Sequence, residues 1–158
     1  GQFQEYIDEN ITKIPNDEEY FGYQPVIDED ENILEMIPYY LPAALKQGIT
    51  KVQQKVELLN GLFIPAHIDR SVNGILSQLG FIPPGLKCDA LGLSKHGSKK
   101  DVEQQYVLQN KITLIRNSDA HYVEQIGEIY SLFNMKEISF AEIKMALNQQ
   151  NKRFVEIQ

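Results

Sequence analysis

The order of hydrophobic and polar positions predicts an N-terminal helix followed by a β-hairpin. Apolar residues recur at helical spacing over residues 2–13, which indicates an amphipathic helix that ends before Pro15. The segment YQPVIDEDENILEMI comes next, with two apolar runs around an acidic turn at residues 28–32, and this pattern is typical of a hairpin. We therefore expect residues 1–48 to form a helix and an acidic β-hairpin.

Apolar runs with strand character then alternate with segments of helical periodicity. Helices are expected at residues 50–61, 72–79, 99–108 and 139–149, and strands at residues 62–68, 88–93, 111–117 and 153–157. The strand LFIPAHI is continuously apolar, which suits a buried parallel strand. Because such alternation is typical of βα units, we expect residues 49–158 to form an α/β fold with a mostly parallel sheet or barrel.

Two of the expected strands end abruptly in polar residues. The segment GLFIPAHIDR reaches His67, and the segment IRNSDAHYVEQIG reaches Asp119 and His121. In parallel α/β folds, ligand sites form at the carboxyl ends of strands. Residues two apart in an extended segment point to the same side, and imidazole with carboxylate suits Zn, Mn or Fe. Each ending is either a polar turn or the edge of a metal site, and the pair of endings favours the metal site.

Length and charge restrict the classes of function. The chain has 158 residues, which suits one domain that buries roughly 70% of its unfolded surface. Its net charge is −7, from 22 acidic and 15 basic residues. This balance argues against broad binding to nucleic acid or to an anionic membrane, both of which need basic surface. An anionic substrate stays compatible, because a few cations or metals can reverse the field inside one cleft.

Cysteine content and hydropathy point to an intracellular setting. Cys88 is the only cysteine, so no intrachain disulfide can form, and its place at the start of an apolar run predicts a buried core thiol. No apolar stretch approaches the roughly 20 residues that cross a bilayer. The polar, acidic start GQFQEYIDEN is unlike a signal peptide. We expect a cytoplasmic location, and the initial Gly suggests a piece of a longer polypeptide.

The polar strand ends also carry a family resemblance. IPAHIDR and NSDAHYVEQIGE resemble the two C-terminal metal motifs of the PHP (polymerase and histidinol phosphatase) family of metal-dependent phosphoesterases. The acidic hairpin, the segment SVNGILSQLGFIPPGL and the stretch LSKHG are similar to one bacterial subgroup of that family. The resemblance implies the C-terminal part of a distorted (β/α)7 barrel with a small hairpin insertion. It also implies that His67, Asp119 and His121 are metal ligands and that Asp119 and His121 act in catalysis.

The chain departs from the family pattern in its histidines. The family's N-terminal strands supply a His-x-His pair, an Asp-His pair, a Glu and a further His, whereas this chain has three histidines and no His-x-His. His96, in SKHG, matches no ligand position and is interpreted as a loop residue. The chain is therefore either the C-terminal half of a PHP protein or a truncated relative that has lost the chemistry.

The function that the resemblance implies is hydrolysis of a phosphate ester. Divalent ions (Zn, Mn or Fe) would activate a water for in-line attack on a phosphorylated small molecule or nucleotide. Arg70 and Arg116 lie near the motifs and suit forked binding of phosphate, with Lys95 a weaker candidate. The alternative is a non-catalytic PHP-like module that acts in partner binding. In either case we expect a missing N-terminal half or a second copy to cover the cut edge of the sheet.

Overall fold

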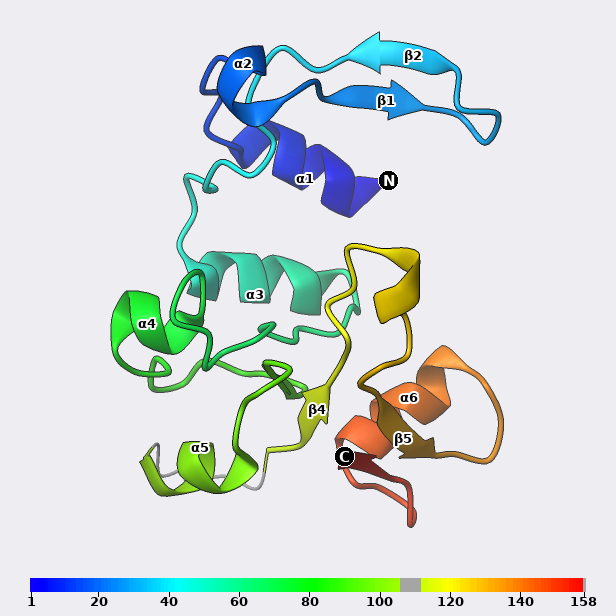
Figure 1. Ribbon diagram of the computed structural model, residues 1–158. Helices are drawn as coiled ribbons and strands as arrows, with labels where there is room; N and C mark the ends of the chain where they lie inside the picture. The colour runs from blue at the N-terminus through cyan, green and yellow to red at the C-terminus, as the bar shows by residue number, and fades with distance from the viewer. Residues whose placement is uncertain (106–111, 158) are drawn as a thin grey trace. The chain divides into compact units, whose positions relative to one another are not determined.

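The computed structural model describes residues 1–105 and 112–157, and these divide into two compact units, Gly1–Lys55 and Val56–Gln158 (Figure 1). The boundary falls within helix α3 (Ile49–Leu58). No helix in the described part of the chain is both long enough and apolar enough to cross a membrane.

The N-terminal unit contains the predicted helix and hairpin. Helix α1 (Gln2–Asn10) is followed by the one-turn helix α2 (Glu18–Phe21), which was not expected from the sequence. Strands β1 (Pro25–Ile27) and β2 (Ile33–Met36) pair antiparallel, so the hairpin prediction is confirmed. The apolar side chains of both strands remain exposed, as for Val26, Ile27, Ile33, Leu34 and Met36.

The acidic turn of the hairpin is held together by one carboxylate. Asp28 accepts hydrogen bonds from the backbone N–H of Asp30, at 3.0 Å, and of Asn32, at 2.8 Å. The side-chain amide of Asn32 donates to the same carboxylate. These hydrogen bonds lower the pKa of Asp28, and the bond from the Asn32 amide has the largest effect. The turn is therefore built around a local Asx-type motif, which accounts for an aspartate at position 28.

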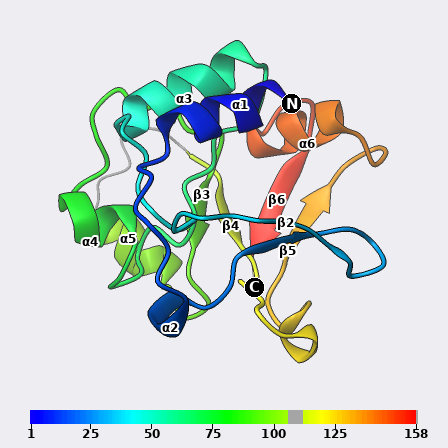
Figure 2. The same cartoon turned by 90° about the horizontal axis from the view of Figure 1, so that it is seen from above.

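In its described residues, the C-terminal unit contains short helices and four strands. Its elements are α4 (Ile75–Leu79), β3 (Leu91–Leu93), α5 (Lys99–Gln105), β4 (Leu114–Arg116), the 3₁₀ turn η1 (Val123–Gln125), β5 (Ser131–Asn134), α6 (Phe140–Leu147) and β6 (Phe154–Ile157). Strands β3 and β4 are parallel, and β5 and β6 are antiparallel. Because β4 also contacts β6, the strands follow one another as β3, β4, β6, β5 (Figure 2).

The α/β class is confirmed, but its details differ from the prediction. The mostly parallel sheet is wrong for β5 and β6, and β5 was not predicted at all. The described strands form three two-stranded sheets rather than one closed sheet, so the barrel stays a proposal. The predicted helix over residues 99–108 is observed as far as Gln105, and residues 106–108 lie outside the described residues. The same holds for residue 111, the first residue of the strand predicted over residues 111–117.

The predicted strand over residues 62–68 is extended but is not a regular strand. Gly92 donates its N–H to the carbonyl of Pro65 at 2.8 Å, and the N–H of Ile68 donates to the carbonyl of Gly92 at 2.8 Å. In a regular parallel ladder that second bond would come from His67, two residues after Pro65. Pro65 itself has no N–H to donate. The backbone therefore carries one extra residue here, and His67 leaves the ladder with a φ of 32°.

The core lies between this extended segment, the strands and helix α6. Ala90, Ile115 and Leu147 form a buried cluster, against which Leu62, Ile64, Phe133, Ile143 and Val155 pack. Ser139 caps α6 by accepting the N–H of Glu142. Glu142 does not return a bond to the backbone of Ser139 as in a capping box, since its carboxylate binds the N–H of Lys136 and the guanidinium of Arg153.

Candidate functional site

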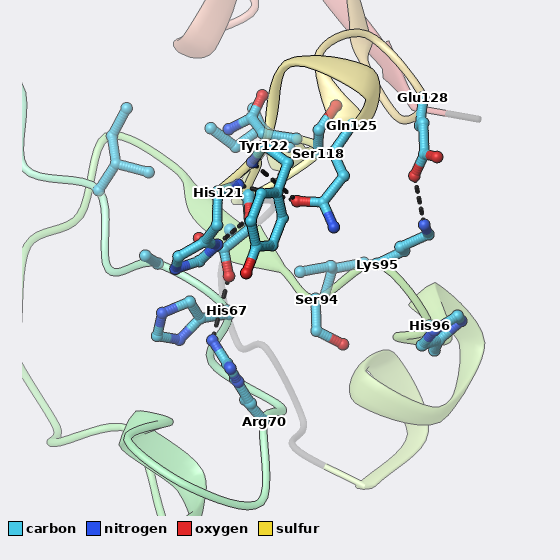
Figure 3. A pocket seen from close by; sticks show the side chains of 17 residues that line it. His67, Arg70, Ser94, Lys95, His96, Ser118, His121, Tyr122, Gln125 and Glu128 are labelled. Carbon is cyan, nitrogen blue, oxygen red and sulfur yellow. Dashed lines mark hydrogen bonds and ion pairs between the residues drawn. The ribbon is translucent and has the colours of Figure 1, made fainter.

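The two polar segments predicted from the sequence open into one cavity of about 810 Å³ in the C-terminal unit (Figure 3). His67 and Arg70 reach it from the extended segment that runs beside β3, and Asp119 and His121 reach it from the loop after β4. The loop after β3 adds a third wall. The structure therefore brings the three candidate ligands together, while their role in binding metal stays a prediction.

His67 has an unusual environment. Its backbone lies in the left-handed region, which a non-glycine residue rarely adopts. Its Nδ1 atom is buried and has no hydrogen-bond partner in the described part of the chain. Buried polar atoms are nearly always paired, and strained backbone gathers at functional sites. Both observations favour a role for His67 that involves a group other than those described.

Asp119 is held by an ion pair across the cavity. Its Oδ2 lies 3.0 Å from Nη1 of Arg70, and both side chains are about half exposed, at 51% and 49%. The backbone of Asp119 also lies in the left-handed region, with a φ of 51°. Asp119 comes three residues after the end of β4, and its carboxylate contacts the segment that carries His67 and Arg70.

His121 is oriented by its neighbours in the loop. Its Nδ1 lies 2.8 Å from the carbonyl oxygen of Asp119, and its backbone N–H donates to Oε1 of Gln125 at 2.8 Å. Because a carbonyl oxygen can only accept, the hydrogen lies on Nδ1, and the lone pair of the neutral ring lies on Nε2. A histidine that ligates a metal is commonly oriented in this way, by a hydrogen bond from its other nitrogen to a carbonyl.

Ser118 stabilises the loop that presents Asp119 and His121. Its hydroxyl accepts the N–H of Gly127 at 3.1 Å and of Ile129 at 3.2 Å, and it donates to the carbonyl of Ile129 at 2.9 Å. Ser118 belongs to the NSDAH motif, but only the structure reveals that its partners are backbone groups about ten residues later.

The loop after β3 is tied to both polar segments. Lys95 forms an ion pair with Glu128 across the cavity. Asp69 accepts the backbone N–H of Ser94 at 2.7 Å and its hydroxyl at 2.8 Å. Asp69 therefore fixes the loop and does not line the cavity, although it follows His67 by two residues. In the view of Figure 3, Lys95 and Glu128 lie on the side opposite His67 and Arg70.

The phosphate-binding candidates separate in the structure. Arg70 and Lys95 line the cavity, whereas Arg116 does not. The guanidinium of Arg116 donates to the carbonyl of Gly97, and its backbone exchanges two hydrogen bonds with the hydroxyl of Ser131. The geometry thus gives Arg116 a structural task, and its phosphate role stays a prediction.

Two other sequence interpretations also change. His96, interpreted as a loop residue, lies in a turn as expected but also lines the cavity. Cys88, expected to be a buried core thiol, is half-buried. Burial, with a contribution from Asp89, raises the pKa of its thiol to about 11. A thiol with that pKa stays protonated at neutral pH, which excludes Cys88 as a ready nucleophile.

The donor atoms suit a divalent metal in kind but not in number. Two imidazoles and a carboxylate are ligands of Zn, Mn and Fe. Among the described residues, however, no three His, Cys, Asp or Glu side chains are grouped so that they could hold one ion. Asp119 is engaged by Arg70 instead. The described residues therefore do not make a complete set of metal ligands by themselves.

Several residues that line the cavity were not predicted from the sequence. Glu128, Tyr122, Gln125 and Ser94 all line it. Tyr122 and Gln125 belong to the NSDAHYVEQIGE motif, so the length of this motif already indicated that residues after His121 contribute to the site. Glu128 pairs with a lysine 33 positions earlier, and no local pattern announces such a contact.

Comparison with known proteins identifies part of the chain. Residues 99–151 match the model of the PHP_C family, which is described as PHP-associated. The resemblance to PHP proteins is confirmed. The PHP-associated segment includes Asp119 and His121 but neither His67 nor Arg70.

Two further proteins are similar to this chain. The uncharacterized protein YqxK of Bacillus subtilis (strain 168) is 32% identical over 110 residues, which cover 65% of this chain and 27% of YqxK. The crystal structure of PfuEndoQ, a lesion-specific endonuclease from Pyrococcus furiosus, matches 98% of this chain with a TM-score of 0.71 and 18% identity, and the match covers 34% of that protein. At this identity the likeness concerns the fold. The chain spans about a quarter to a third of the length of these two proteins.

Proposed function

We propose that this chain supplies one wall of the active site of a PHP-type metal-dependent phosphoesterase. The observation that carries the proposal is the meeting of His67, Asp119 and His121 in one cavity of about 810 Å³. The match of the PHP-associated segment supports it, because that segment provides two of the three residues. In this proposal all three are metal ligands, and Asp119 and His121 also serve catalysis by holding the ion beside the substrate.

The chemistry would follow from the metal and the cations around it. A bound Zn, Mn or Fe ion supplies a water of lowered pKa and neutralises phosphoryl charge. His121 contributes Nε2, since Nδ1 is fixed on the Asp119 carbonyl. Arg70 and Lys95, which line the cavity, are placed to attract the phosphate of a substrate. Arg116 is a less favoured phosphate ligand because its guanidinium binds the Gly97 carbonyl.

The remaining ligands would come from another polypeptide segment. Three ligands are fewer than a cluster of several metals requires, so we propose that a PHP-type N-terminal half, or a second copy of the chain, completes the site and a (β/α)7 barrel. The substrate class is a phosphorylated small molecule or a nucleotide. The endonuclease activity named for the Pyrococcus furiosus protein favours a phosphodiester among these.

Metal binding by the purified 158-residue chain tests this proposal. We expect weak binding of Mn²⁺, measured from the free-ion signal in electron paramagnetic resonance, because open coordination lowers affinity. His121→Ala should remove this binding. His96→Ala is the matched control, since His96 lines the same cavity but is not proposed as a ligand. Mn²⁺ binding that is equal in all three proteins would overturn the proposed ligand set.

Turnover provides the second test. The chain alone should hydrolyse bis(p-nitrophenyl) phosphate hardly above the rate of free Mn²⁺, because the clamp on the phosphoryl oxygens is incomplete. Addition of a polypeptide with the His-x-His and Asp-His strands of a PHP protein should raise the rate, and His121→Ala should abolish the gain. Strong turnover by the chain alone, dependent on His121, would show that it needs no further ligands.

The second candidate function is a non-catalytic PHP-like module that binds a partner. The observation in its favour is the hairpin, whose apolar side chains on both strands are exposed. This function predicts no turnover even with the complementing polypeptide present. It also predicts that His121→Ala leaves the binding of that polypeptide unchanged.

A further inference from the structure

The hairpin of β1 and β2 has an apolar face that stays exposed in the described part of the chain (Figure 1). Cross-strand partners lie on the same face of a sheet, and side chains alternate between the faces along a strand. One face therefore carries only apolar side chains, those of Pro25, Ile27, Ile33 and Met36. The other face presents Val26 beside its partner Glu35. Every residue of both strands is exposed, so neither face packs against a core.

The outer edge of β2 is open for a further strand. Among the described residues, the sheet of β1 and β2 contains no third strand. The N–H of Ile37 donates to the carbonyl of Gln24 at 2.9 Å. Because bonded and non-bonded pairs alternate along an antiparallel ladder, the next pair, Pro25 and Met36, turns its backbone groups outward. Pro25 has no N–H, so of this pair only Met36, on the β2 edge, offers both a donor and an acceptor.

The charge around this edge is negative. Residues 14–45 contain eight acidic and no basic residues. Glu35 belongs to β2 itself, and the turn at residues 28–32 contributes four of these acids. In the described part of the chain, no ion pair involves a carboxylate of the hairpin. A second copy of the chain would bring the same negative charge to the edge, whereas a basic segment would be attracted to it. The charge therefore favours a basic partner.

We propose that β2 accepts an extended basic polypeptide segment as a third strand of this sheet, paired antiparallel to β2. In this partner, apolar side chains alternate with lysine or arginine. The apolar side chains extend the face that contains Ile33 and Met36, and the cations lie beside Glu35 on the other face. This inference names the partner for the second candidate function, and it does not depend on a metal site.

The pairing determines which backbone groups of the partner bind to β2. The residue directly opposite Met36 exchanges both hydrogen bonds with it and lies on the same face of the sheet. The apolar residues of the partner therefore donate their N–H groups to β2, whereas the N–H groups of its basic residues point away from the hairpin. Methylation of backbone nitrogens distinguishes the two sets, because it removes a donor and leaves the side chain unchanged.

The test uses a fluorescently labelled octapeptide of alternating lysine and valine, whose anisotropy reports binding to the purified chain in buffer with EDTA. We expect binding that weakens as salt rises from about 20 mM to about 200 mM, because salt screens the attraction. The octapeptide N-methylated at its valines should not bind, and the one N-methylated at its lysines should bind like the parent. An octapeptide of alternating glutamate and valine should not bind.

Glu35→Gln tests the charge on the side of the hairpin. It should weaken binding of the lysine–valine octapeptide roughly two- to fivefold, the factor that corresponds to one exposed ion pair. Glu9→Gln is the matched control, since Glu9 is an exposed glutamate of helix α1 in the same unit. It removes the same charge away from the hairpin and should have a smaller effect. Circular dichroism of both variants, unchanged from the wild type, ensures that the comparison concerns folded protein.

Several outcomes would overturn this inference. Equal losses in Glu35→Gln and Glu9→Gln would mean that the net charge of the unit, and not the β2 edge, attracts the peptide. Equal binding of the two N-methylated octapeptides would refute strand addition. Absence of binding would refute the basic partner, and light scattering that reports a dimer under the same conditions would then assign the edge to a second copy. All of these measurements exclude metal, so their failure leaves the tests of the proposed phosphoesterase unaffected.

Discussion

Ser118 shows how one side chain can set the geometry of a loop. Its hydroxyl serves three backbone groups of Gly127 and Ile129, so the segment that carries Asp119 and His121 is closed by a polar side chain rather than by apolar packing. The equivalent task on the facing segment falls to Asp69, which binds Ser94. In each of the two polar segments, a residue within two positions of a candidate ligand holds the backbone.

Ser118→Ala is expected to loosen this loop. The change leaves two backbone N–H groups and one carbonyl without their partner, which costs roughly 1–3 kcal/mol when such groups stay shielded from water. Amide hydrogen exchange at Gly127 and Ile129 should accelerate, and Mn²⁺ binding should weaken. Ser71→Ala, at an exposed position, is the control and should leave both measurements unchanged. Unaltered exchange at Gly127 would contradict this account of Ser118.

A second residue-scale prediction concerns pH. The guanidinium of Arg153, together with the N–H of Lys136, holds the pKa of the Glu142 carboxyl below its ordinary value of 4.5. A folded-state pKa below the unfolded one stabilises the fold above the unfolded value, and this contribution is lost as the pH falls through the folded value. Glu142→Gln should therefore lower the urea midpoint at pH 7, and its gap from the wild type should close as the pH falls below 4.5.

Glu137→Gln is the control for that measurement, because Glu137 lies exposed in the same loop. It should alter the urea midpoint little at any pH in the range. A gap between Glu142→Gln and the wild type that persists undiminished under acidic conditions would mean that packing, and not the charge of Glu142, stabilises the start of α6.

At the scale of elements, the position of His67 depends on the close approach of two backbone segments, the one around Pro65 and strand β3. The extended segment around Pro65 runs so close to β3 that a Cβ atom on Gly92 would lie 3.2 Å from the Cα of Ala66 and from the carbonyl oxygen of Pro65. It would also lie 3.3 Å from the backbone nitrogen of His67. Glycine at this strand position thus permits the contact that holds the His67 backbone against the sheet.

Gly92→Ala should push the His67 segment away from β3. We expect destabilisation by roughly 1–3 kcal/mol, the range for an added methyl group in a packed site. Urea unfolding measures this loss, and Mn²⁺ binding should fall with it. Gly48→Ala is the matched control, because a Cβ there would meet nothing within 4 Å. Equal midpoints for the two alanine variants would show that the segment adjusts freely.

Elements with strong periodicity or clear caps could be predicted from the sequence, and those defined by distant partners could not. Helix α6 follows from Ser139 and its apolar face, and the hairpin follows from two apolar runs around an acidic turn. Strand β5 was missed, because its pairing partner β6 lies some twenty residues later and only alternate residues are shielded. The apolar run before His67 predicted a strand, but Pro65 and the extra residue interrupt its ladder.

The candidate site likewise combines residues that could be predicted from the sequence with contacts that could not. His67, Asp119 and His121 were found because chain order places each just after an extended segment. The pairs Arg70–Asp119 and Lys95–Glu128 join residues 49 and 33 positions apart, and only the fold determines such contacts. For the same reason Arg70 and Arg116 looked equivalent in the sequence, although only Arg70 reaches the cavity.

At the scale of the whole molecule, charge is divided unequally between the two units. Residues 1–55 contain 11 acidic and 4 basic residues, whereas residues 56–158 contain 11 of each. The net charge of −7 therefore belongs entirely to the N-terminal unit. The unit that carries the cavity is neutral, so the charge argument against binding to nucleic acid or to an anionic membrane, drawn from the full chain, does not apply to it.

This distribution leads to a prediction about association. The hairpin exposes apolar side chains on both strands, which favours pairing with another copy, while the acidic charge of the same unit opposes it. Light scattering should therefore detect association that increases from about 20 mM to about 500 mM salt, because salt screens the repulsion. The double variant Ile33→Lys, Leu34→Lys should stay monomeric. A wild type that is monomeric at every salt concentration would speak against a second copy as the partner.

The extra residue between Pro65 and Ile68 has a consequence for evolution. Deletion of Ala66 would place Ile68 two positions after Pro65, and the bond from its N–H to the Gly92 carbonyl would then fit a regular ladder. His67 would return to an ordinary extended conformation, with its imidazole turned to the other face of the segment. Selection for stability alone would thus favour a shorter loop without the site. A lineage that retains this extra residue would therefore retain it for a reason other than stability.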